Sequence, residues 1–300
     1  MTDSDRIQIP VSLAILDDRM QSLRTDSHVA VHYTRGKWLE GPSYSRQGRY
    51  LVFSDIPNDR TLRLDEMSGT VNVFEEPSRF ANGHTHDRTG RLLTCLHGER
   101  CVVRREHDGR EVVIASSYDG RRLNSPNDVV ASSQGVIWFS DPTYGIISDY
   151  EGHEAVPEQA ACGLYRWTEG SEEPVLISSR FAMPNGLAFG IDERVLYVVD
   201  SERDTISALT LDGEGGVGAE RTLIEDGRGF DGIRVDAAGR IWAATRDGVS
   251  CFDVDGIELL RIAMPEPVSN LEFGGRQGNT LYLTATTTLY SLRTSVRGSA

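Results

Sequence analysis

The feature that most constrains the fold is a short motif that recurs six times along the chain. Each copy has a turn, usually with glycine, before a run of β-branched and aromatic residues, as in SRQGRYLVFSD at 45–55. The turn positions, spaced by 42, 45, 58, 46 and 39 residues, are Gly48, Gly90, Gly135, Glu193, Gly239 and Gly278. A period of about 40–50 residues built from short strands is typical of a β-propeller. We therefore predict an all-β chain that forms a six-bladed β-propeller.

The two ends of the repeat array predict how the ring closes. The last repeat is one strand short, whereas His28–Tyr33 (HVAVHY) has an alternating pattern ahead of the first repeat. Pairing of this N-terminal strand as the outer strand of the last blade would close the ring and cover an exposed edge. We expect one propeller domain over residues 28–300, preceded by an N-terminal extension over 1–27 in which LDDRMQSL forms a short helix. Two stacked β-domains are the alternative, which the lack of a linker between repeats disfavours.

Charge and composition exclude several classes of partner. The chain has 31 Lys and Arg against 45 Asp and Glu, a net charge of −14, which argues against binding to nucleic acid or an anionic membrane. No apolar run approaches the roughly 18–20 residues of a membrane helix. The N-terminus shows no signal-peptide pattern and the four cysteines form no CxxC pair, so we expect reduced thiols and a cytoplasmic location; a Cys95–Cys101 bridge is the alternative. The sequence does not indicate an oligomeric state.

Polar residues occupy one register throughout the repeat. Eight residues before the turn positions stand Glu40, Asn82, Asn127, Asn185, Asp231 and Asn270, all carboxylates or carboxamides. The innermost strand of each propeller blade lines the central channel, so these side chains should form a ring at one channel end. Hard oxygen donors with two negative charges suit a divalent cation such as Ca²⁺. Mg²⁺ and Mn²⁺ are alternatives, and Zn²⁺ would prefer His or Cys ligands. The competing interpretation is that Asn and Asp here only form turns.

Longer motifs around these residues resemble a known family. EGPSY, LNSPNDVV with WFSDPTYG, MPNGLAF with LYVVDS, and DGIRVD with GRIWAA are similar to motifs of the SMP-30/gluconolactonase group, the regucalcin-like six-bladed propellers. The resemblance spans about Glu40 to Gly275 and implies lactone hydrolysis with a single divalent metal. It implies that Glu40, Asn127, Asn185 and Asp231 are the metal ligands and that Asp231 also transfers a proton.

The chain departs from that family at two places. His84 and His86 stand in the ANGHTH segment where related sequences often have apolar residues, and Ser125 stands where some relatives have an arginine that contacts sugar hydroxyls. The choice of substrate is therefore not fixed by the resemblance.

We expect hydrolysis of a sugar lactone to its aldonic acid, with Asp231 as general base and the metal polarising the lactone carbonyl. His84 follows Asn82 by two residues, so on a regular strand it shares the channel-facing side. An insertion at 144–163 accounts for the 58-residue interval and is expected to overhang the channel mouth. The predicted substrate contacts are Asn82, His84, Asn270 and Tyr144.

Two other functions remain open at this point. Propellers with a similar Glu/Asn/Asn/Asp ring hydrolyse phosphotriesters or fluorophosphates, and other propellers are non-catalytic modules that bind calcium or proteins. The chain has no GxSxG, HExxH or Walker motif that would indicate another hydrolase class.

Overall fold

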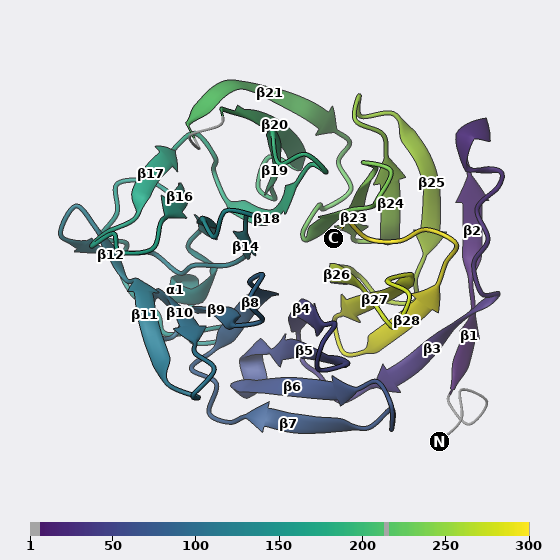
Figure 1. The fold of residues 1–300 in the computed structure, drawn as a ribbon, viewed down its shortest axis with the longest axis horizontal. Helices are drawn as coiled ribbons and strands as arrows, with labels where there is room; N and C mark the ends of the chain where they lie inside the picture. The colour runs from purple at the N-terminus through teal and green to yellow at the C-terminus, as the bar shows by residue number, and fades with distance from the viewer. Residues whose placement is uncertain (1–6, 213–215, 300) are drawn as a thin grey trace.

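Six antiparallel sheets surround a central axis in the computed structural model, which describes residues 7–212 and 216–299 (Figure 1). Blades 1 to 3 are β4 (Leu39–Ser45), β5 (Tyr50–Asp55), β6 (Arg60–Asp65), β7 (Val71–Glu75); β8 (Ala81–His86), β9 (Leu92–Leu96), β10 (Cys101–Arg105), β11 (Glu111–Ala115); β14 (Val129–Ala131), β15 (Ile137–Asp141), β16 (Gly163–Trp167), β17 (Val175–Ser178). Blades 4 to 6 are β18 (Pro184–Phe189), β19 (Val195–Asp200), β20 (Thr205–Leu211), β21 (Val217–Glu225); β22 (Ile233–Val235), β23 (Ile241–Thr245), β24 (Gly248–Phe252), β25 (Glu258–Ala263); β26 (Val268–Gly274), β27 (Thr280–Ala285), β28 (Leu289–Arg293). The predicted six-bladed β-propeller is confirmed.

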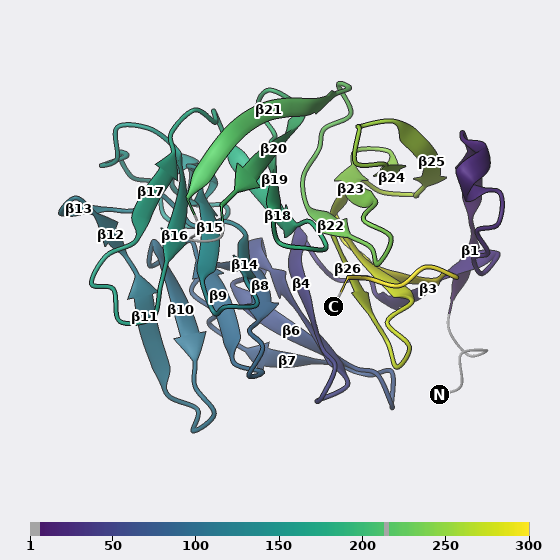
Figure 2. The ribbon, with the colours of Figure 1, turned by 45° about the horizontal axis from the view of Figure 1, so that its top comes forward.

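An N-terminal strand closes the ring, as predicted. β3 (His28–Tyr33) pairs antiparallel with β28 and becomes the fourth strand of blade 6. It is not the outermost strand, because β1 (Gln8–Pro10) pairs along its free edge, and Figure 2 shows both strands at the rim of the molecule.

The segment before β3 is more closely integrated than the sequence indicated. β2 (Ser12–Ile15) adds a fifth strand to blade 5 by pairing with β25. The expected helix at 16–23 is reduced to one 3-10 turn at Asp18–Met20, whose Met20 is buried against blades 5 and 6. Residues 1–6 of the expected extension lie outside the described residues.

The repeated turns connect the first and second strands of each blade. Gly90, Gly135, Gly239 and Gly278 have positive φ angles, a region that glycine enters without steric cost. In blade 4 the glycine is absent and Glu193 itself adopts φ 54°. Its carboxylate accepts hydrogen bonds from the backbone N–H and hydroxyl of Ser133, which ties this turn to the equivalent turn of blade 3.

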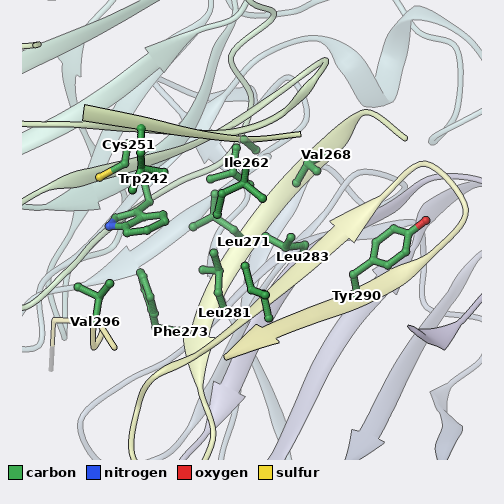
Figure 3. Packing of buried hydrophobic residues seen from close by; sticks show 14 of the residues in the cluster. Trp242, Cys251, Ile262, Val268, Leu271, Phe273, Leu281, Leu283, Tyr290 and Val296 are labelled. Carbon is green, nitrogen blue, oxygen red and sulfur yellow. The ribbon is translucent and has the colours of Figure 1, made fainter. Parts of the chain in front are cut away.

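Apolar side chains pack between neighbouring blades. Figure 3 shows this packing for blades 5 and 6, where Trp242 meets Phe273 edge-on with ring centroids 5.7 Å apart. Trp138 makes the equivalent contact with Phe189 between blades 3 and 4. Cys95 and Cys101 are buried free thiols. In the two ranges that the structure describes, no helix has the length and apolar character needed to cross a bilayer.

Candidate functional site

The six predicted ring residues lie at the beginning of an innermost strand or two residues before it. Glu40, Asn82, Asn185 and Asn270 belong to β4, β8, β18 and β26, and Asn127 and Asp231 stand two residues ahead of β14 and β22. In the first four strands the pairing register shifts at this point. Such β-bulges redirect side chains next to functional sites. The equivalent positions along the strands place the six residues at the same end of the channel, and the bulge redirects four of them.

Glycines beside the ring let neighbouring blades approach closely. A Cβ atom on Gly186 would lie 2.5 Å from the carbonyl oxygen of Asp231, and the N–H of Gly186 donates to that oxygen at 3.3 Å. Gly83 likewise abuts the backbone of Asn127, and its N–H donates to that carbonyl at 2.9 Å. In both motifs, the glycine that follows the polar residue thus lets its strand contact the backbone of the next blade.

A cavity of about 400 Å³ opens at this end of the channel. It is lined by Trp38, Glu40, Asn82, Asn127, Tyr144, Glu151, Asn185, Ser201, Gly229, Phe230, Asp231, Arg246, Pro267 and Val268. All four predicted metal ligands, together with predicted substrate contacts Asn82 and Tyr144, therefore meet at one cavity. A larger polar groove of about 710 Å³ lies between blades 6 and 1, but no ring residue lines it.

The carboxylates of Glu40 and Asp231 in this cavity have raised pKa values. Burial, opposed by hydrogen bonds from the Gly41 N–H and the Asn270 amide, raises the pKa of Glu40. Burial and repulsion from Glu40 and Glu151 raise the pKa of Asp231 well above its usual range, against a hydrogen bond from Asn185. Neither Glu40 nor Asp231 forms an ion pair with any residue in the described ranges.

The donor set of the ring fits a hard divalent cation. Two buried carboxylates without a cationic partner repel each other, and a cation among their oxygens would remove that cost. Within the described residues there is no cluster of three or more His, Cys, Asp or Glu side chains that could hold a metal. The predicted ligand set is of another kind, because two of its four members are the carboxamides of Asn127 and Asn185. Carboxylate and amide oxygens together are ligands that Ca²⁺ accepts.

The structure does not bring His84 to the cavity. His84 is 1% exposed and lies between blades 1 and 2, where its ring nitrogens face Ser54 Oγ and Thr94 Oγ1 at 2.9 Å each. Burial lowers the pKa of His84 to about 3. The expectation that His84 shares a side with Asn82 fails because the bulge between Ala81 and His84 interrupts the strand alternation.

Asn270 also has a different place from the one expected. Its Nδ2 donates to Glu40 Oε2 at 3.1 Å, and its Oδ1 accepts from the N–H of Leu271 at 2.9 Å. Among the residues that the structure describes, it is absent from the cavity lining. Asn270 therefore orients Glu40, where a substrate contact was predicted.

The 144–163 insertion reaches the cavity through Tyr144, which begins helix α1 (Tyr144–Ile147), and through Glu151. Ser125 anchors this loop, since its hydroxyl donates to Pro142 O at 2.7 Å and accepts from Gly145 N–H at 3.0 Å. Ser125 is fully buried, so its hydroxyl contacts the buried side of the loop.

Several cavity residues were not predicted from the sequence. Glu151 lies in the insertion, where no periodicity distinguishes it, and burial raises its pKa to about 7. Trp38, Phe230 and Val268 each stand one or two residues before a ring residue and give the cavity an apolar wall. Their position immediately upstream of the ring register is a signal that could have found them. Ser201 accepts from Asn185 Nδ2 at 3.0 Å and donates to the carbonyl of Phe230 at 2.7 Å.

Comparison with known proteins finds lactonases among the similar sequences and structures. A family model described as the SMP-30/Gluconolactonase/LRE-like region matches residues 38–287. A gluconolactonase from Zymomonas mobilis is 30% identical over 290 residues, covering 87% of this chain and 80% of the relative. A pentonolactonase from Haloferax volcanii is 31% identical over 257 residues, with 82% and 80% covered. The solved structure of a Xanthomonas campestris gluconolactonase superposes with a TM-score of 0.89 at 32% identity, covering 96% of this chain and 97% of the other. The chain belongs to the SMP-30/gluconolactonase/LRE-like family.

Proposed function

We propose that this protein hydrolyses sugar lactones to aldonic acids and that the cavity at the ring end of the channel is its active site. The observation that carries the proposal is the convergence of Glu40, Asn127, Asn185 and Asp231, from four different blades, on one cavity of about 400 Å³. Relatives named gluconolactonase and pentonolactonase support sugar lactones as the substrate class.

Glu40, Asn127, Asn185 and Asp231 would hold one divalent cation, with Ca²⁺ the ion that best suits these oxygens. When bound, such a cation polarises the lactone carbonyl and stabilises negative charge on its oxygen. Asn270 supports this arrangement from outside the cavity, because its amide holds the carboxylate of Glu40.

Asp231 is the proposed general base. Its carboxylate takes a proton from the attacking water as the C–O bond to the acyl carbon forms, and returns it to the ring oxygen as the ester bond breaks. The amide of Asn185 bonds to Asp231 and is itself held by Ser201 Oγ, which orients the base. Trp38, Phe230 and Val268 contribute apolar surface to the cavity, which reduces the access of bulk water.

Base uptake at constant pH with D-glucono-1,5-lactone tests this function. Metal-stripped protein is measured first, then protein with Ca²⁺, Mg²⁺, Mn²⁺ or Zn²⁺ restored, with spontaneous hydrolysis subtracted. We expect turnover that returns with a divalent ion. Absence of turnover on any sugar lactone, with cleavage of a phosphotriester under the same conditions, would contradict the proposal.

A further inference from the structure

We propose that His97 is a positioning residue that joins the 144–163 loop to Asn82 and holds Asn82 Oδ1 as the acceptor for a hydroxyl group of the sugar lactone. This inference rests on the proposed function and specifies how the cavity distinguishes a hydroxylated lactone from a plain one.

The contacts of His97 determine which of its nitrogens carries hydrogen. His97 Nδ1 lies 3.0 Å from the carbonyl oxygen of Glu151, and a carbonyl oxygen only accepts hydrogen bonds, so Nδ1 is the donor. The side chain is fully buried, and burial lowers the pKa of His97 to about 4, so the ring is neutral. A neutral imidazole has one donor and one acceptor. Nε2 is therefore an acceptor.

The same logic orients the amide of Asn82. Asn82 lies against His97 Nε2 at 3.2 Å, and only its NH₂ group can donate to that nitrogen. The amide oxygen is thereby turned away from His97 and has no hydrogen-bond partner in the protein. Asn82 is 2% exposed and lines the cavity. Leaving such a buried acceptor unsatisfied costs about 1–3 kcal/mol, which a ligand that donates a hydrogen bond would recover.

A sugar lactone supplies such donors and an unsubstituted lactone does not. Two other polar side chains at the cavity are held by the protein, since Asn185 donates to Ser201 and Glu40 accepts from Gly41 and Asn270. Asn82 is the cavity-lining residue, within the described ranges, whose buried oxygen lacks a partner.

The 144–163 loop also contacts His97 and helps to fix its position. Gly145 of α1 packs directly on the imidazole, since a Cβ atom there would lie 2.5 Å from His97 Cβ and Cγ. The residue whose carbonyl fixes the tautomer, Glu151, also lines the cavity. His97 can therefore orient Asn82 only when the 144–163 loop packs against its imidazole.

Two lactones and four variants, one of them a double substitution, test the inference. We would measure kcat/KM for D-glucono-1,5-lactone and for δ-valerolactone, which has the same ring without hydroxyl groups. Asn82→Leu should lower kcat/KM for gluconolactone at least about 10-fold while changing the value for δ-valerolactone less than about twofold, because a missing partner for a buried hydrogen bond acts only on the hydroxylated substrate.

His97→Leu should lower the gluconolactone value in the same selective way, and adding it to Asn82→Leu should cause little further loss, because His97 acts through Asn82. His97→Gln, which keeps one donor and one acceptor, should recover part of the activity that His97→Leu loses. Calcium affinity measured by calorimetry should be unchanged in Asn82→Leu, and thermal melting reports the fold of each variant.

Equal losses on both lactones in folded Asn82→Leu, or a loss of calcium affinity, would overturn the inference, because Asn82 would then serve the cation or the reaction itself. Wild-type protein that hydrolyses no sugar lactone with any ion would overturn the proposed function, and this inference with it.

Discussion

At the scale of single residues, the two carboxylates of the cavity, Glu40 and Asp231, differ in the groups that contact them. Glu40 is held by the Gly41 N–H and by the Asn270 amide, which both donate to its Oε2. Asp231 bonds to Asn185 and faces the repulsion of Glu40 and Glu151. Burial raises the pKa of both carboxylates, so the assignment rests on their contacts: two hydrogen bonds fix Oε2 of Glu40, which favours Asp231 for proton transfer.

Asp231→Asn tests this assignment. The substitution keeps the size of the side chain but removes both the base and one charge of the proposed cation site. General base catalysis contributes about 10²–10⁴-fold, so we expect kcat on gluconolactone to fall by about 100-fold or more with saturating divalent ion. Because the substitution also removes a buried repulsion, the melting temperature without added ions should not fall. Wild-type kcat at saturating ion would refute the role of Asp231 as base.

At the scale of the strand, the bulge at the ring explains what could be predicted from the sequence. The offset of eight residues from the turn selects equivalent positions in all six blades, at the start of each innermost strand or two residues before it. The prediction for His84 assumed regular alternation along the strand, and the bulge between Ala81 and His84 interrupts it. The residue types do not indicate where such a bulge occurs. Glu151 was missed because the loop that carries it has no repeat partner. Periodic elements were thus predictable, whereas irregular ones depended on tertiary contacts.

Gly186→Ala tests the close approach of blades at the ring. A Cβ atom would meet the carbonyl oxygen of Asp231 at 2.5 Å, so blade 4 must shift relative to blade 5. We expect a loss of about 1–3 kcal/mol in the free energy of unfolding, measured by urea denaturation, and a fall in kcat.

Gly190→Ala is the matched control, because it follows the same strand and its nearest neighbours to a new Cβ are 3.6 Å away. It should change the free energy of unfolding much less than Gly186→Ala. Similar values for the two variants would show that the blades do not constrain each other at the ring.

At the scale of the whole molecule, the site depends on a closed ring. The ring residues come from six blades, so their spacing is set by the angles between sheets and not by any one sheet. β3 covers the outer edge of β28, and its Val29 belongs to the apolar cluster shared by blades 5 and 6. β1 and β2 lie outside this closure, on the free edges of β3 and β25.

Two N-terminal truncations test separately the closure of the ring by β3 and the covering of sheet edges by β1 and β2. Removing residues 1–15 deletes β1 and β2 but keeps Met20 and β3, so we expect a folded protein with a lower melting temperature and unchanged KM for gluconolactone. Removing residues 1–33 also deletes β3, which exposes the edge of β28 and opens the ring, so we expect loss of cooperative unfolding and of calcium binding. A synthetic peptide of residues 16–33 added to the longer truncation should restore part of both, because it supplies the missing strand. Equal stability of the two truncations would show that blade 6 holds its place in the ring with three strands, and that the cavity does not need the N-terminal strand.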